Sequence, residues 1–315
     1  MNNLKINSIR YFFFGLVLLI TSCKEKSVEN SDTLAIGSMQ KEIQKPKKKL
    51  TQEFKDYWFN GTAEITSYSL QQARYGEIRK GNAVMIFVTE PFLPGLQVKA
   101  DTNDSNNIPV LKLNATKNYI TGIYPYSIMT SSFYPVYDNQ HALKLSFSSQ
   151  EWCGHVYAQL NNRNDFEIMS HSYFGSEADQ VYHLDKANLE NEIWNKIRIN
   201  PTDLPIGELN MIPSLEFIRL THKELKTYKA ITALTEADGI KTYEITYPEL
   251  ERVLKINFRS EFPYTIEGWL DSYKDGFGEK AKVLTSTATI INRIKTPYWK
   301  QNSNKDLSLR DSLGL

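Results

Sequence analysis

Lys241-Thr242-Tyr243-Glu244-Ile245-Thr246-Tyr247 is the stretch of this chain that most clearly indicates its fold. Aromatic and β-branched residues alternate here with polar ones, which is typical of a strand that buries one face. Asp238-Gly239 before it and Pro248 after it are turn signals. We therefore expect a strand between two tight turns.

Short runs of the same kind recur along most of the chain. The chain is also rich in aromatic residues, with 18 Tyr and 15 Phe. Turn residues separate the runs at the spacing expected of an all-β fold. One hairpin is expected to turn at Lys80-Gly81-Asn82. Strands are expected at residues 62–78, 83–89, 110–113, 122–132, 143–147, 228–234, 252–258, 264–273 and 283–294.

One segment has the period of a helix instead. Leu189, Ile193 and Ile197 recur at every fourth position, Asp185 is a natural N-cap, and Asn200-Pro201 ends the pattern. The sequence predicts an amphipathic helix over residues 186–199, packed on the sheet.

Carboxylates in this region are expected to have ordinary structural roles. Glu190 and Glu192 are predicted to form the solvated face of the helix, and Asp271 and Asp275 to flank a turn.

The N-terminus has the pattern of a lipoprotein signal. Lys5 and Arg10 precede an apolar run at residues 11–20, which is about ten residues long and too short for a permanent membrane-spanning helix. Ile20-Thr21-Ser22-Cys23 then forms a lipobox, so residues 1–22 are predicted to be removed and Cys23 to be lipidated. Lys24 is not the Asp that retains lipoproteins in the inner membrane, and we therefore expect a lipid-anchored protein of the cell envelope, at the outer membrane.

The rest of the chain divides by composition. Residues 23–49 are polar and charged and are predicted to be a flexible tether. Residues 50–299 are expected to form a single β-rich domain, and residues 300–315 a frayed polar tail.

Charge and cysteine content narrow the function. The formal net charge is +1, so nucleic acid is not an expected partner. Contact with the membrane is expected through the lipid on Cys23. With Cys23 lipidated, Cys153 has no disulfide partner in this chain, since the chain has two Cys. No cofactor motif stands out, and no cofactor is expected.

The most suggestive interior stretch is Glu151-Trp152-Cys153-Gly154-His155-Val156-Tyr157-Ala158-Gln159-Leu160. In a strand, Cys153, His155 and Tyr157 share the face opposite Val156, Ala158 and Leu160. If the following loop spans residues 161–165, Ala158 opposes Ile168.

That pairing places His155 opposite His171 and Cys153 opposite Tyr173. Cys153, His155 and His171 are therefore candidates for a zinc or copper site, or for a thiol nucleophile with its base. A packed hairpin whose imidazoles are satisfied by hydrogen bonds is the alternative interpretation. Trp152, Tyr157 and Tyr173 are candidate ligand-binding residues, because aromatic side chains line apolar grooves well.

Three runs of the chain stand out, Ala73-Arg74-Tyr75-Gly76-Glu77, Gly122-Ile123-Tyr124-Pro125-Tyr126-Ser127-Ile128-Met129 and Glu151-Trp152-Cys153-Gly154-His155. On these runs, residues 62–90, 122–160 and 203–220 resemble an uncharacterised group of Gram-negative envelope lipoproteins, and the resemblance covers nearly the whole mature chain. Members of this group often have the label "septum formation inhibitor Maf". The cytosolic Maf pyrophosphatases have a Ser-x-Ser-x-Arg-Arg type phosphate motif that this chain lacks, so no catalytic residue is carried over from them.

Residues 241–248, 252–258 and 263–270, with Gly268-Trp269, are similar to the adjacent strands of periplasmic half-barrels that handle lipids and lipoproteins. This resemblance covers about sixty residues and implies a fold more than an activity. We therefore expect a mainly β fold, a curved antiparallel sheet or half-barrel with one amphipathic helix packed on it. The expected function is non-enzymatic binding of an apolar ligand or an envelope protein in the groove of that sheet.

Overall fold

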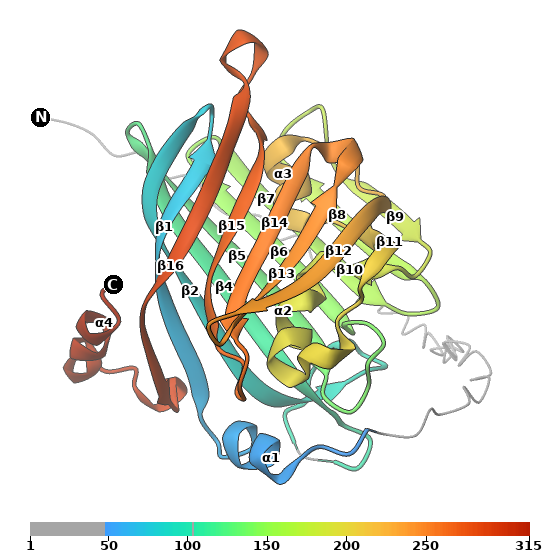
Figure 1. The fold of residues 1–315 in the computed structure, drawn as a ribbon, viewed down its shortest axis with the longest axis vertical. Coiled ribbons are helices and arrows are strands. Elements are labelled where there is room, and N and C mark those ends of the chain that lie inside the picture. The colour runs from blue at the N-terminus through green and yellow to red at the C-terminus, as the bar shows by residue number, and fades with distance from the viewer. Residues whose placement is uncertain (1–47, 103) are drawn as a thin grey trace, which may run out of the picture. The chain divides into compact units, whose positions relative to one another are not determined.

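A curved antiparallel sheet dominates the computed structural model, which describes residues 48–102 and 104–315 (Figure 1). The predicted signal sequence, Cys23 and all but the end of the predicted tether lie outside the described residues. Among the helices described, none is long and apolar enough to cross a membrane.

The sheet contains sixteen strands of the described part of the chain. The strands of the first half are β1 (Ala63–Arg74), β2 (Glu77–Leu93), β3 (Val98–Lys99), β4 (Ile108–Thr121), β5 (Tyr124–Pro135), β6 (Lys144–Glu151), β7 (Gly154–Asn162), β8 (Phe166–Ser172) and β9 (Gln180–Leu184). Those of the second half are β10 (Asn188–Leu189), β11 (Gly207–Ile212), β12 (Tyr228–Ala237), β13 (Ile240–Tyr247), β14 (Arg252–Arg259), β15 (Ile266–Asp275) and β16 (Lys282–Thr296). The helices are α1 (Gln52–Trp58), α2 (Glu190–Ile199), α3 (Leu215–Thr221) and α4 (Ser308–Ser312).

The strands follow a meander whose two halves meet at the first strand. β10 to β16 lie in chain order, β16 pairs with β1, and β2 and β4 to β9 continue the sheet to its other edge. Figure 1 shows β1 in blue beside β16 in red. Ladder pairing is antiparallel except between β10 and β11. The expected fold class, a mainly β curved antiparallel sheet, is confirmed.

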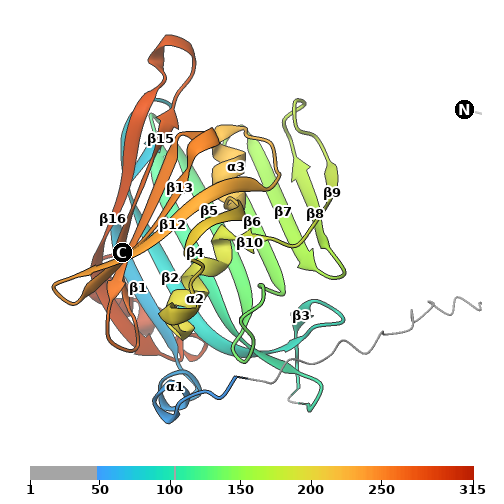
Figure 2. The same cartoon turned by 45° about the vertical axis from the view of Figure 1, so that its right-hand side comes forward.

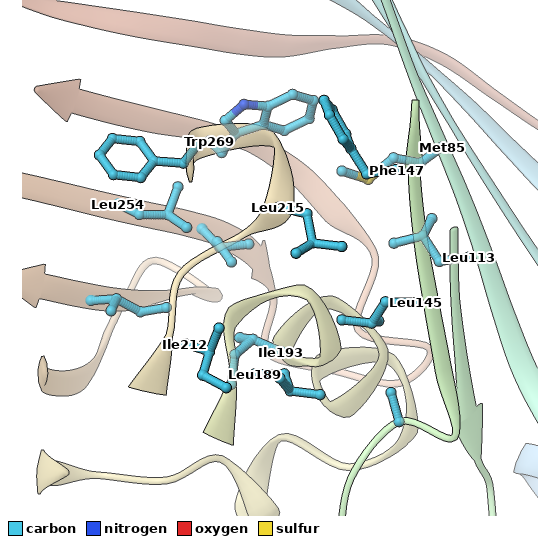
Figure 3. Packing of buried hydrophobic residues seen from close by; sticks show 14 of the residues in the cluster. Met85, Leu113, Leu145, Phe147, Leu189, Ile193, Ile212, Leu215, Leu254 and Trp269 are labelled. Atoms are coloured by element: carbon cyan, nitrogen blue, oxygen red, sulfur yellow. The ribbon is translucent and has the colours of Figure 1, made fainter. Parts of the chain in front are cut away.

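Helices α2 and α3 lie in the hollow of the sheet (Figure 2). Ile193 and Ile197 of α2 are completely buried, as the fourfold spacing predicts. They pack in a core that includes Leu113 and Leu145 from one wall and Leu254 and Trp269 from the other (Figure 3). Burial of these apolar side chains holds the helix inside the sheet.

Two local expectations about the elements are wrong. The helix begins at Glu190, after an extended Leu189, and not at residue 186 after Asp185, because Asn188 and Leu189 pair with β11. The first hairpin turns at Tyr75-Gly76, not at Gly81. Gly81 lies inside β2, where a Cβ would be 2.1 Å from the Asn118 backbone oxygen. Glycine is required here because β2 and β4 approach each other closely, and not because the chain turns.

The C-terminal tail is also more ordered than its polarity indicates. Leu313 is 6% exposed and packs with Ile65 and Val84 in a small second cluster. Ser67 Oγ donates to the Leu313 carbonyl at 2.5 Å. The expectation of a frayed tail is therefore wrong for its last residues.

Candidate functional site

The hairpin of β6 and β7 contains four of the sequence candidates and places His155 and Tyr157 on the outer side of the sheet. Val156, Ala158 and Leu160 are buried, whereas His155 and Tyr157 are exposed, so the predicted division of faces is confirmed. Trp152 and Cys153 lie in the turn between the strands.

The predicted pairing of β7 with β8 is wrong by two residues. Ala158 pairs with Ser170, and Leu160 pairs with Ile168. The ladder continues to Asn162 and Phe166, so the connecting loop is shorter than expected. His171 consequently lies opposite Tyr157 and not opposite His155.

Cys153, His155 and His171 are not brought together as a metal site. In the described part of the chain, the one group of three ligand-type side chains close enough to share an ion is Asp165, Glu167 and His183. His171 Nδ1 lies 3.2 Å from an Asp179 carboxylate oxygen instead.

Cys153 is an exposed thiol. A hydrogen bond with the Glu151 side chain raises its pKa. The same carboxylate accepts a hydrogen bond from the Cys153 backbone N–H at 2.6 Å. A raised pKa lowers the fraction of thiolate at neutral pH, which is the opposite of what an activated nucleophile needs.

The three aromatic candidates are exposed as well. Trp152, Tyr157 and Tyr173 are 68%, 41% and 76% accessible. None of them lines either of the two cavities described below.

The acidic residues of α2 are buried, contrary to the expectation of a solvated face. Glu190 accepts hydrogen bonds from Arg252 at 2.6 and 2.8 Å and from the Tyr247 hydroxyl at 2.9 Å. Arg252 also donates to both oxygens of Asp271, at 2.8 and 3.0 Å. Asp271 is thus a residue of β15 within an ion network and does not flank a turn.

Glu192 is likewise completely buried. It accepts a hydrogen bond from the Ala142 N–H at 2.7 Å and lies 3.2 Å from Lys196 Nζ. Buried carboxylates require such partners, since an unpaired charge away from water is costly. These carboxylates therefore attach α2 to β14 and to the segment before β6.

Two cavities lie on the inner side of the sheet. The smaller, of ≈ 70 Å³, lies between α2, α3 and both walls. Its apolar lining consists of Ala83, Met85, Leu113, Ala115, Trp194, Phe217, Leu220, Leu254, Trp269 and Tyr273. Its polar lining includes Gln72, whose side-chain oxygen has no hydrogen-bond partner in the described residues.

The larger cavity, of ≈ 280 Å³, lies at the end of α3. It is lined in part by Arg74, Tyr75, His222 and Phe277. Phe217, Leu220 and Tyr273 line both cavities, so these three side chains separate one space from the other. The rings of Phe217 and Tyr273 meet edge to face, with centroids 5.4 Å apart.

Arg74 is the residue of this region that the sequence prediction missed. It occupies an inward position of β1, in the same alternation as the buried Tyr68, Leu70 and Gln72. Burial lowers the pKa of Arg74 and the surrounding tyrosines raise it, with a net shift upward, so the guanidinium stays charged. The sequence did contain a signal for this residue, because Arg74 falls on the same alternate positions of the strand as the inward-facing residues before it.

Comparison with known proteins gives no family: no family model, no curated protein and no solved structure matches this chain.

Proposed function

We propose that this protein is a lipid-anchored component of the cell envelope that binds an apolar ligand on the inner side of its curved sheet. The observation that carries the proposal is the pair of cavities that meet at Phe217, Leu220 and Tyr273. Ligand sites in proteins are concave, mainly apolar and provided with a few polar groups. The smaller cavity is mainly apolar with a few polar groups, and the larger one has polar and apolar lining in about equal parts.

The separating wall is made of side chains. Phe217 and Leu220 belong to α3, a helix of seven residues. Rotamer changes of these two side chains join the smaller cavity to the larger one, which allows an extended apolar chain to pass between α3 and the sheet. Such changes need no movement of the strands.

The ionisable groups around the smaller cavity favour binding over catalysis. Arg252 is held by Glu190 and Asp271, and Lys117 Nζ is 2.7 Å from Glu216. Groups held in mutual ion pairs stabilise the fold and are not free to transfer protons to a ligand.

A fluorescence titration tests ligand binding. The neutral probe N-phenyl-1-naphthylamine is expected to gain fluorescence when added to the purified protein. Leu220→Trp, which fills the shared wall, is expected to weaken the binding, whereas Leu307→Trp, at an exposed position, leaves it unchanged. Failure of the probe to bind, or equal binding by both variants, would contradict the proposal.

The anchor is tested separately. Growth of the producing cells with a radiolabelled fatty acid is expected to label the wild-type chain and not Cys23→Ala. The variant is expected to keep residues 1–22, because lipidation precedes cleavage at a lipobox. Equal labelling of the two chains would show that Cys23 is not the attachment point.

A further inference from the structure

Arg74 differs from the other buried arginines of the described chain in having no acidic partner. The three buried arginines are Arg74, Arg198 and Arg252. Arg198 is paired with Glu64, and Arg252 with Glu190 and Asp271. No carboxylate of the described residues lies within ion-pair distance of Arg74, whose nearest titratable neighbours are tyrosines and which is only 5% exposed.

Neutral groups surround the Arg74 guanidinium. One Nη donates to the Leu220 carbonyl at 2.6 Å, and the other to the hydroxyls of Tyr126 at 3.1 Å and Tyr75 at 3.2 Å. The guanidinium carbon lies 4.1 Å from the centre of the Tyr75 ring. Nε has no hydrogen-bond partner in the described structure. The hydrogen bonds and the tyrosine ring reduce the free energy that is needed to bury this charge, but they leave the guanidinium without a counter-ion.

The larger cavity adjoins this charge. Arg74 and Tyr75 line it together with Phe217 and Leu220, so one side of the space is cationic and polar and another is apolar. The acids in its lining are engaged or exposed: Asp275 accepts a hydrogen bond from the Gly76 N–H at 2.6 Å, Glu249 is paired with Lys226, and Glu251 faces solvent.

Lys223 and Lys274 are exposed members of the same lining. Their charges are hydrated and screened by salt, so they contribute less to binding than a buried charge does.

We infer that the ligand is a monoanionic amphiphile, a long-chain carboxylate, whose head group is recognised by Arg74 with the hydroxyl of Tyr75, the two residues that line the larger cavity together. This inference rests on the proposed function and names the ligand class of that site. A carboxylate supplies the missing counter-ion, and the planar guanidinium matches its geometry. The alkyl chain then passes Phe217 and Leu220 toward Trp194 and Trp269 of the smaller cavity.

Calorimetric titration with two probes of equal chain length tests the inference. Decanoate and decan-1-ol are titrated at neutral pH into the full chain, into Arg74→Gln and into Lys274→Gln. The wild type is expected to bind decanoate roughly tenfold more tightly than the alcohol, since hydrogen bonds to charged groups are the strong ones. Arg74→Gln is expected to lose this preference, whereas Lys274→Gln, which removes an exposed charge from the same lining, keeps it.

The outcomes separate the inference from the proposal on which it rests. Equal affinity of the wild type for both probes leaves apolar binding standing and overturns the role of Arg74. Binding of neither probe overturns both. If Arg74→Gln does not fold, the wild-type preference and its reduction in Tyr75→Phe decide the question, because Tyr75 lines the cavity and its hydroxyl lies beside Arg74.

Discussion

Both Nη atoms of Arg198 donate to the carboxylate of Glu64, at 2.5 and 2.7 Å, although the two residues lie 134 positions apart. Both side chains are about 1% exposed. The Tyr57 hydroxyl donates to the same carboxylate at 2.5 Å. This one carboxylate therefore connects α1, α2 and the first strand of the sheet.

Glu64→Gln is expected to destabilise the protein by about 3 kcal/mol, because it leaves the buried Arg198 charge without its counter-ion. Urea unfolding measures the change in the free energy of unfolding. Glu77→Gln is the control, since Glu77 pairs with Arg79 at the surface and its loss is expected to cost less than about 1 kcal/mol. Equal losses in the two variants would contradict the structural role of the Arg198 pair.

The same carboxylate makes stability depend on pH. Burial would raise the pKa of Glu64, but the charge and hydrogen bonds of Arg198 hold it below the ordinary value of 4.5. A group whose pKa is lower in the folded state contributes its full stability above the unfolded pKa and loses it as pH falls toward the folded pKa. The free energy of unfolding is therefore expected to decline below about pH 4.5, and to decline less steeply in Glu64→Gln. Parallel pH profiles for the two proteins, measured by urea unfolding, would exclude this contribution.

The strands were predictable because their pattern is local. The runs at residues 241–247 and 252–258 correspond closely to β13 (Ile240–Tyr247) and β14 (Arg252–Arg259), since alternation and turn residues both lie within the segment. Gly81 shows the limit of such reasoning. Glycine next to asparagine is typical of a turn, and only the position of the neighbouring β4 reveals that the glycine is needed inside a strand.

The interior was not predictable, because it is assembled from distant segments. Glu190 and Glu192 follow the polar positions of an amphipathic pattern. In the folded chain, however, Arg252 of β14 and the Ala142 N–H of the segment before β6 are their partners. A helix that a sheet encloses has no solvated face. The sequence of the helix alone does not indicate that it is enclosed. Arg74 was missed for the same reason, since the cavity beside it includes residues from the distant α3.

Gly81→Ala is expected to destabilise the protein by about 2 kcal/mol or more, because the added Cβ meets the Asn118 backbone oxygen at 2.1 Å and the strands must move apart. Gly95→Ala is the control, since no atom lies within 4 Å of its added Cβ. Thermal unfolding followed by circular dichroism compares the two. A normal melting temperature for Gly81→Ala would show that β2 and β4 do not pair in this register.

Cys153 is expected to be alkylated in the native protein, because its side chain is exposed. The reaction with iodoacetamide near pH 8 is expected to accelerate in Glu151→Gln, since loss of the carboxylate removes the cause of the raised pKa and increases the thiolate fraction. Peptide mass mapping assigns the modification to Cys153. An unreactive thiol in the native protein would contradict the exposed turn.

Leu313→Ala is expected to cost about 2 kcal/mol, near the lower limit for a buried leucine, because the residue packs in the small second cluster with Ile65 and Val84 and not in the main core. Leu307→Ala is the matched control within the same tail. Its side chain is 60% exposed, and its loss is expected to change the free energy of unfolding by less than about 0.5 kcal/mol. Urea unfolding of both variants distinguishes a packed C-terminal segment from a free one, since a free tail would make the two substitutions equally harmless. Because Leu313 lies against β1 and β2 on the side opposite Glu64, the loss is also expected to leave binding of the neutral naphthylamine probe unchanged.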